Sequence, residues 1–235
     1  MHRIWDEHFP DDQCNEIYQA SAQPLADFLP VKYIFANGLA VVCRNMQKHE
    51  DSLIYKIWRS AAAEGIGYGI DEIPTLAIFR TEVLLNHYCV IFEEIATGRI
   101  VGLTLIGPSG YSRTSDDRFG ESNVLITKEF RGQKLGNETI WVDAALMKQL
   151  GFKMLLNDAL ASNRRMQAIF QRNRVENTLP LLTLGVIPNG CYTNGYGWDD
   201  QVIIFSHLQS HPLLKNFTEL ADEIVNSTVS KLEIV

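Results

Sequence analysis

The chain has 235 residues, of which 46% are hydrophobic and 21% charged, and its formal net charge at pH 7 is −7. The length suits one large domain with a sizeable core. The negative charge argues against nucleic acid or an anionic membrane as partner, because both need clustered Lys and Arg. No apolar run is as long as a membrane span, and the N-terminus lacks a signal-peptide layout. We therefore expect a cytoplasmic protein, with nuclear access or organelle import left open.

The four cysteines and six histidines are scattered along the chain without metal-ligand spacing. We expect no metal, and surface or core histidines. Without a secretory signal, reduced and mostly buried thiols are a better prediction than a disulfide framework.

Hydrophobic periodicity and turn residues predict a mixed α/β layout around one central sheet. The dipeptide Asn37-Gly38 suits a type I′ hairpin turn, because both central positions of that turn need positive φ. In chain order we expect strands at 31–36 and 39–43, helices at 49–65 and 75–85, strands at 88–92 and 100–106, a surface loop at 109–120, a strand at 124–127, a helix that stops at Gly151, a strand at 152–156, a helix at 163–173, strands at 186–188 and 201–205, and a helical tail from about Leu213.

The segment from Val124 to Asn137 carries the most chemical information. A strand there runs into the loop Arg131-Gly132-Gln133-Lys134-Leu135-Gly136, and a helix follows. Unpaired N–H groups and the positive end of the helix dipole make such a junction an anion site. An ordinary strand–helix turn is the alternative, and the spacing alone does not separate the two. A Rossmann site is disfavoured because the glycines follow antiparallel hairpins, and a P-loop is excluded because Gly-Lys-Ser/Thr is absent.

This loop, with the helix, strand and Asn-headed helix after it, resembles the GNAT superfamily of N-acetyltransferases. The resemblance implies an α/β GNAT fold whose mixed, mostly antiparallel sheet is flanked by helices and splayed at the family's strand 4. We expect the acetyltransferase domain at 31–208. An N-terminal segment, 1–30, would pack on it, and a helical tail, 209–235, would follow.

Further matches are similar to the fungal N-acetyltransferases that act on L-azetidine-2-carboxylate and other proline analogues. They recur in order along the chain: Gln23-Pro24-Leu25-Ala26-Asp27, the loop, Leu150-Gly151-Phe152, Asn157 with Asn163, Val186-Ile187-Pro188 and Asn194-Gly195-Tyr196. The resemblance implies acetyl-CoA as cofactor and direct transfer of its acetyl group to the amine of a small molecule in a ternary complex.

The resemblance also assigns a cofactor site at the end of the strand and in the loop. Its residues would be Ile126, Thr127, Arg131, Gly132, Gln133, Lys134, Leu135, Gly136, Asn137 and Asn163. Lys134 stands where the family has a glycine, which is tolerable only if the position does not require positive φ. From the sequence alone, Asn163 could equally be a helix N-cap.

Three polar residues would serve the acceptor amine. The resemblance places Asn157 on the substrate, and Glu121 stands where the family has an Asn, with Asn123 on the same strand face. Glu121 could act as general base or be a solvated carboxylate, and Asn157 could be a turn residue. The catalytic set is Glu121, Asn157 and the backbone of Ile126, while Phe170 replaces the family's tyrosine acid.

Two alternatives stay open at this point. The chain could acetylate a protein or peptide amine, or it could be a non-catalytic CoA-binding module. Apart from its substrate, no nucleic-acid or membrane partner is expected, and a homodimer is compatible with the sequence.

Overall fold

A computed structural model describes residues 28–65, 67–83, 88–109, 119–175, 182–193, 197–208 and 215–235. Several segments that the sequence singled out lie outside these residues. They are Gln23-Pro24-Leu25-Ala26-Asp27, most of the loop at 109–120, and Asn194-Gly195-Tyr196, together with the side chain of Phe170.

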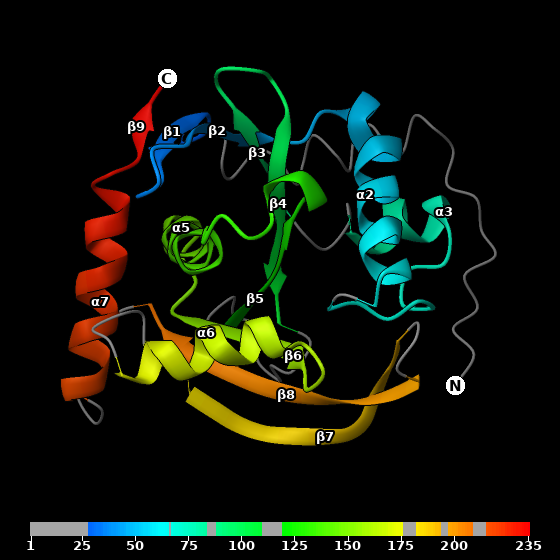
Figure 1. Ribbon diagram of the computed structural model, residues 1–235. Coiled ribbons are helices and arrows are strands. Elements are labelled where there is room, and N and C mark those ends of the chain that lie inside the picture. The colour runs from blue at the N-terminus through cyan, green and yellow to red at the C-terminus, as the bar shows by residue number, and fades with distance from the viewer. Residues whose placement is uncertain are drawn as a thin grey trace.

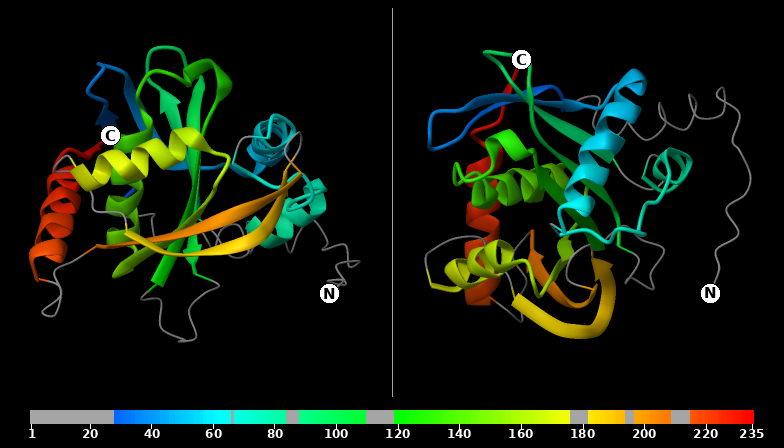
Figure 2. Two further views of the ribbon diagram at one scale, coloured as in Figure 1. Left: turned by 60° about the horizontal axis from the view of Figure 1, so that its bottom comes forward. Right: turned by 45° about the vertical axis from the view of Figure 1, so that its right-hand side comes forward.

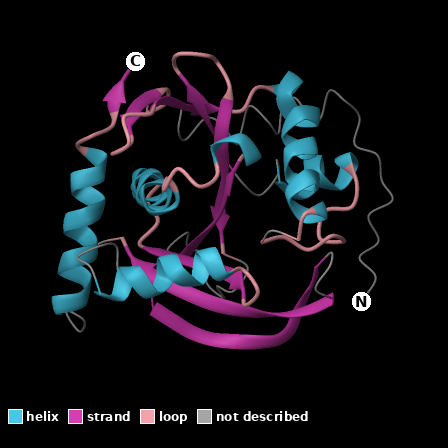
Figure 3. Cartoon of the chain, in the orientation of Figure 1, coloured by secondary structure: helices cyan, strands magenta, loops and turns pink. Residues whose placement is uncertain are grey.

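The described residues form one mixed, mostly antiparallel sheet with helices on both faces (Figures 1 and 3). Its strand order is β7-β8-β6-β5-β4-β3-β2-β1-β9, and β5–β6 is the parallel pair. The elements are β1 (Val31–Ile34), β2 (Ala40–Asn45), η2 (Lys48–Glu50), α2 (Asp51–Ala63), α3 (Leu76–Ile78), η3 (Phe79–Val83), β3 (Tyr88–Glu94), β4 (Ile100–Pro108), β5 (Phe119–Ile126), η4 (Lys128–Phe130), α5 (Gly136–Gln149), β6 (Met154–Leu160), α6 (Arg164–Val175), β7 (Leu182–Thr193), β8 (Gly197–His207), α7 (Lys215–Val229) and β9 (Glu233–Ile234). The predicted sheet and its flanking helices are confirmed.

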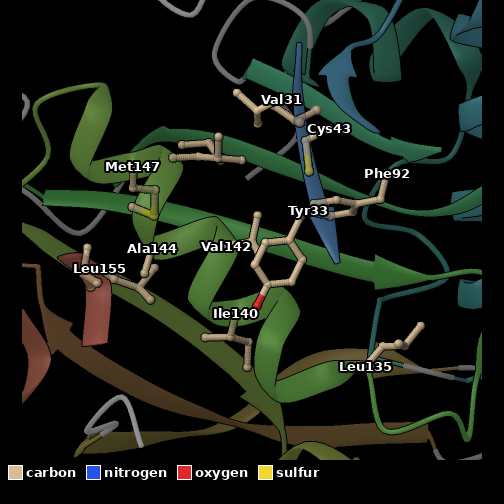
Figure 4. Packing of buried hydrophobic residues seen from close by; sticks show 14 of the residues in the cluster. Val31, Tyr33, Cys43, Phe92, Leu135, Ile140, Val142, Ala144, Met147 and Leu155 are labelled. Carbon is tan, nitrogen blue, oxygen red and sulfur yellow. The ribbon is translucent and has the colours of Figure 1, made fainter. Parts of the chain in front are cut away.

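Two hydrophobic cores lie on opposite faces of the sheet. Helices α5 and α7 cover one face, and α2 and α3 cover the other (Figure 2). Strand β3 serves both cores, because Val90 packs in the α5 core and Ile91 in the α2 core, as the side-chain period of a strand requires. In the α5 core, Tyr33 of β1 points toward Ile140 and Val142 of α5 (Figure 4).

The first hairpin differs from its predicted turn. Gly38 has a φ of +87°, but Asn37 is not among the residues with positive φ, so the type I′ prediction is wrong. The Gly38 amide bonds the Phe35 carbonyl at 2.8 Å, and the Phe35 amide bonds the Leu39 carbonyl at 2.9 Å. These bonds define a three-residue loop with a glycine bulge, in which one positive-φ residue is enough.

Several strands are longer than predicted, and one predicted helix is not a continuous α-helix. Strand β5 begins at Phe119 rather than at 124, and β7 and β8 form a long hairpin in place of two short segments. The stretch predicted as a helix at 75–85 is one α-helical turn, α3, followed by the π-helical segment η3. The tail is helical as expected. Its helix α7 packs on α5 through Ala221 and Val225, and β9 pairs with β1 at the sheet edge.

Candidate active site

Strands β5 and β6 pair at one end only and then diverge. Their parallel ladder consists of Phe119 with Met154 and Gly120 with Leu155. At the next level, the Ser122 amide donates to the side-chain Oδ1 of Asn157 at 2.7 Å instead of to the backbone of β6. Beyond Asn157 the strands share no ladder pair, so a wedge opens between them. The splayed strand is the one that the sequence identified, and it is the fifth strand of this chain.

The backbone amides of Val124 and Ile126 point into the wedge. On the other side of β5, the Thr127 amide bonds the Val101 carbonyl of β4 at 2.9 Å. Amides alternate in direction along an antiparallel strand. Those of Ser122, Val124 and Ile126 therefore face β6, and the Ser122–Asn157 bond confirms this direction. A ligand in the wedge meets two backbone N–H groups in a row.

The two carbonyls that face the same way are already hydrogen-bonded. The Tyr68 hydroxyl donates to the Val124 carbonyl at 3.0 Å, and Arg131 Nε donates to the Ile126 carbonyl at 2.9 Å. Arg131 also donates from Nη1 to Glu64 at the end of α2, at 2.9 Å. The Arg131 guanidinium thus joins the end of β5 to α2. Because the guanidinium already has these partners, the groups of this loop that a ligand could use are its backbone amides.

The glycine-bearing loop connects η4 to α5 through two residues with positive φ. Gly132 has a φ of +83° and Lys134 a φ of +63°. Lys134 therefore does occupy a left-handed conformation, which disfavours a residue with a Cβ. A Cβ on Gly136, the first residue of α5, would lie 2.8 Å from Ile169 Cδ1, so this glycine allows α6 to pass close to the start of α5.

The other predicted cofactor residues have these environments. Leu135 is 3% exposed in the α5 core, so only its backbone is available to a ligand. The Thr127 hydroxyl lies 2.9 Å from the Ile100 carbonyl of β4. Gln133 is exposed, and the Oδ1 of Asn137 is buried without a hydrogen-bond partner among the described residues.

Asn163 is both an N-cap and a neighbour of the loop after α2. Its Oδ1 accepts a hydrogen bond from the Met166 amide at 3.1 Å, which caps α6. Its Nδ2 lies 3.2 Å from the position of a Cβ built on Gly67. The Asn163 side chain thus meets the segment that leads to Tyr68.

On the sheet face toward α2, the wedge is flanked by carboxylates. Glu121 and Asn123 share the face of Leu125, which packs in the α2 core. Asp158 of β6 points to the same face, because its neighbour Ala159 lies in the α5 core. The pairing of Gly120 with Leu155 puts Asn123 and Asp158 at the same level across the wedge.

Sequence reasoning missed Asp158, although it follows the highlighted Asn157 directly. Burial raises the pKa of the Asp158 carboxyl, a hydrogen bond from Gln201 lowers it, and the nearby charge of Glu121 raises it further. The Gln201 Nε2 lies 2.7 Å from Asp158 Oδ2. A carboxyl with a raised pKa in a cleft is a candidate for proton transfer.

The surroundings of this face are acidic. Burial is the main cause that raises the pKa of the Cys191 thiol to about 12, and the charges of Glu72, Asp71, Asp158 and Asp199 raise it further. The charges of Glu72 and Asp158 likewise raise the pKa of Tyr68, after the larger effect of burial. Carboxylates therefore predominate around Cys191 and Tyr68, while Arg131 supplies a positive charge that acts on Tyr68 in the opposite sense.

No family model matches this chain, and no curated protein matches it by sequence. Solved structures do match its fold. A GCN5-related N-acetyltransferase from Kribbella flavida is 14% identical with a TM-score of 0.58, over 71% of this chain and 97% of that chain. An N-acetyltransferase from Staphylococcus aureus Mu50 is 19% identical with a TM-score of 0.56, over 72% and 99%.

A spermidine N-acetyltransferase from Vibrio cholerae, solved with CoA and spermine, is 11% identical with a TM-score of 0.54, over 72% of this chain and 95% of that chain. Each of these proteins is matched over nearly its whole length, and the matched part of this chain is similar to a complete acetyltransferase domain. The chain has the fold of the GNAT N-acetyltransferases.

Proposed function

We propose that this protein is an acetyl-CoA-dependent N-acetyltransferase that acts on the amine of a small molecule by direct transfer in a ternary complex. The observation that carries the proposal is the wedge between β5 and β6, with the Val124 and Ile126 amides directed into it. The wedge leads to the glycine-bearing loop and the start of α5. The Vibrio cholerae enzyme of the same fold was solved with CoA, which supports this choice of cofactor.

The residues around the wedge fit an extended thioester with a pyrophosphate at one end. The Ile126 amide, at the loop end of β5, would pair with an amide group of the pantetheine arm, as an added strand pairs with a sheet edge. The loop amides from 131 to 137 and the α5 N-terminus would hold the pyrophosphate. The Nδ2 of Asn163 would donate to the cofactor from the α2 side.

When bound, acetyl-CoA supplies the acetyl thioester. The Val124 amide, which lies farther from the loop than the Ile126 amide, would then stabilise the negative charge that develops on the thioester oxygen. Glu121 would take a proton from the acceptor ammonium, and Asn123 on the same face would position the amine. Asn157 is buried, bonds Ser122 and points to the opposite face of the sheet, so its contribution would come through the shape of the wedge.

The acidic face supports an acceptor with a positive charge. Glu72, Asp71, Asp158 and Asp199 all act on the same half-buried Cys191 thiol, and a cationic amine would gain from their field. The sequence resemblance favours an amino acid or a proline analogue such as azetidine-2-carboxylate. An amino acid and a polyamine are thus the two classes of acceptor to compare. They can be told apart by experiment, because an amino acid carries a carboxylate and a polyamine does not.

Two measurements test the proposal. Isothermal titration calorimetry with acetyl-CoA should detect binding, and no binding at millimolar cofactor would rule the function out. Release of CoA is then followed with azetidine-2-carboxylate, polyamines, arylalkylamines and peptides in parallel. Turnover of a small amine supports the proposal, peptide turnover replaces it with protein acetylation, and binding without turnover of any amine indicates a non-catalytic module.

A further inference from the structure

The carboxylate of Glu64 lies where two electrostatic effects disfavour a negative charge. Glu64 is the C-cap of α2, and the last carbonyls of a helix form the negative end of its dipole. Its Oε2 also lies 2.9 Å from Nη1 of Arg131, the first residue of the loop that is proposed to hold a pyrophosphate. A carboxylate at this place disfavours the end of α2 and repels the proposed ligand, so its presence calls for a compensating role.

Of the two cations beside Glu64, Arg131 is the one held in a single orientation. Its Nη1 donates to Glu64 and its Nε donates to the Ile126 carbonyl of β5, both at 2.9 Å, and its side chain is 16% exposed. A guanidinium is a planar fork, so two bonds to acceptors on different elements fix its orientation. Lys128 Nζ lies 3.4 Å from the other Glu64 oxygen, but its side chain is 73% exposed, and exposed ion pairs contribute little.

The position of Arg131 matters because the glycine-bearing loop begins there. The next residue, Gly132, has a φ of +83°, and glycine has more backbone freedom than any other residue type. A loop that must be ordered when its ligand arrives binds more weakly than a loop that is held in place beforehand. Glu64 holds the first residue of this loop from α2, and Ile126 holds it from β5.

We propose that Glu64 is a positioning residue, which holds the Arg131 guanidinium on the Ile126 carbonyl and so fixes the start of the glycine-bearing loop for its anionic ligand. Glu64 does not touch the ligand in this role. It acts through Arg131, which places the loop amides that follow. The purpose of the arrangement rests on the proposed function, because the anion is the pyrophosphate of acetyl-CoA, whereas its structural effect does not.

The charge of Glu64 and its positioning effect act on anion binding in opposite directions. If the charge alone mattered, Glu64→Gln would remove a repulsion and the variant would bind acetyl-CoA more tightly. If Glu64 positions Arg131, the same substitution exchanges a charge-assisted hydrogen bond for a weaker neutral one, and binding weakens. Lys128→Gln is the matched control, because it removes the other ion pair of this carboxylate and leaves the bonds of Arg131 in place.

The structural effect is tested in the ligand-free protein. Hydrogen exchange of the Arg131 Nε–H group, which bonds the Ile126 carbonyl, is measured by NMR. Exchange should accelerate about fivefold in Glu64→Gln and stay within about twofold of wild type in Lys128→Gln. Unchanged exchange in Glu64→Gln overturns the inference, whether or not the protein binds acetyl-CoA.

Calorimetry then connects Glu64 to the cofactor. Glu64→Gln should weaken acetyl-CoA binding about fivefold, and Lys128→Gln should change it by no more than about twofold. Arg131→Lys keeps the charge but lacks the fork that joins Glu64 to Ile126, so in that background Glu64→Gln should weaken binding no further.

Three results would overturn the positioning role of Glu64. They are tighter binding in Glu64→Gln, an equal loss in Lys128→Gln, and a further loss when Glu64→Gln is added to Arg131→Lys. Accelerated exchange in Glu64→Gln, in a protein whose wild type does not bind acetyl-CoA, would instead refute the proposed function and leave the positioning of Arg131 intact.

Discussion

The side-chain oxygen of Asn157 accepts the backbone amide of Ser122 at 2.7 Å, in the place where the parallel ladder of β5 and β6 would have its next rung. A side chain is longer than a backbone carbonyl, so this bond satisfies the Ser122 amide while it lets the strands separate. The wedge therefore opens without leaving a buried donor unpaired at its apex.

Removing this side chain should lower stability. Asn157→Ala leaves the buried Ser122 amide without an acceptor, and we expect it to reduce the free energy of unfolding by about 1–3 kcal/mol. Asn123→Ala is the control, because Asn123 lies on the opposite face of β5 and no such bond joins it to β6 among the described residues. Urea denaturation of the two variants measures the difference, and equal midpoints would contradict the role of Asn157.

Two substitutions of Lys134 separate the effect of its strained backbone from the effect of its ammonium charge. Because its φ is +63°, Lys134→Gly should be more stable than Lys134→Ala by about 1 kcal/mol, as measured by chemical denaturation. Both variants lose the ammonium. If it contacts the pyrophosphate, both should bind acetyl-CoA more weakly and with a smaller dependence on salt. Weaker binding in Lys134→Ala alone would assign the effect to the backbone.

The buried carboxyl group of Asp143 should make the free energy of unfolding decrease as the pH rises. Burial raises its pKa to about 7 in the folded protein, above the value for an exposed aspartate. The folded state therefore holds this proton more tightly than the unfolded state, and its stabilising effect is lost as pH increases through about 7. From pH 5 to 8 the wild type should lose about 3 kcal/mol relative to Asp143→Asn, as measured by urea denaturation at each pH. Parallel curves would show that Asp143 titrates normally.

The two carboxylates beside the wedge should have different kinetic effects. Glu121→Gln should lower kcat and spare acetyl-CoA binding, since Glu121 is the proposed base. The pKa of Asp158 is raised by burial and by the charge of Glu121, so Glu121→Gln should also move the Asp158 ionisation toward lower pH. Asp158→Asn keeps the shape of the side chain and removes that ionisation.

The pH dependence of kcat identifies which carboxylate acts. A base must be ionised, so the rate should rise with pH through the pKa of the acting group. Loss of the rising limb in Asp158→Asn, with the limb retained in Glu121→Gln, would transfer the role of base from Glu121 to Asp158. Full activity of Glu121→Gln across the pH range would exclude Glu121.

The sequence by itself determined the order of strands and helices and the place of the loop. Periodicity sets which face of each element is apolar, and Gly132 and Gly136 mark where the chain turns or another helix passes close. These are local properties, which neighbouring residues fix. The turn type at Asn37-Gly38 is not such a local property. It depends on the length of the loop, and the pairing of the two strands sets that length.

Only the tertiary structure decided what surrounds the wedge. Asp143 and Thr104 lie 39 positions apart in the chain and form a hydrogen bond because α5 packs on β4. Tyr68 reaches the Val124 carbonyl from a loop that the sequence did not highlight, and Asp158 gains its raised pKa from burial. Pairing, burial and charge across distant segments are not encoded in any local pattern, so the group of carboxylates beside the wedge emerged only when the chain was folded.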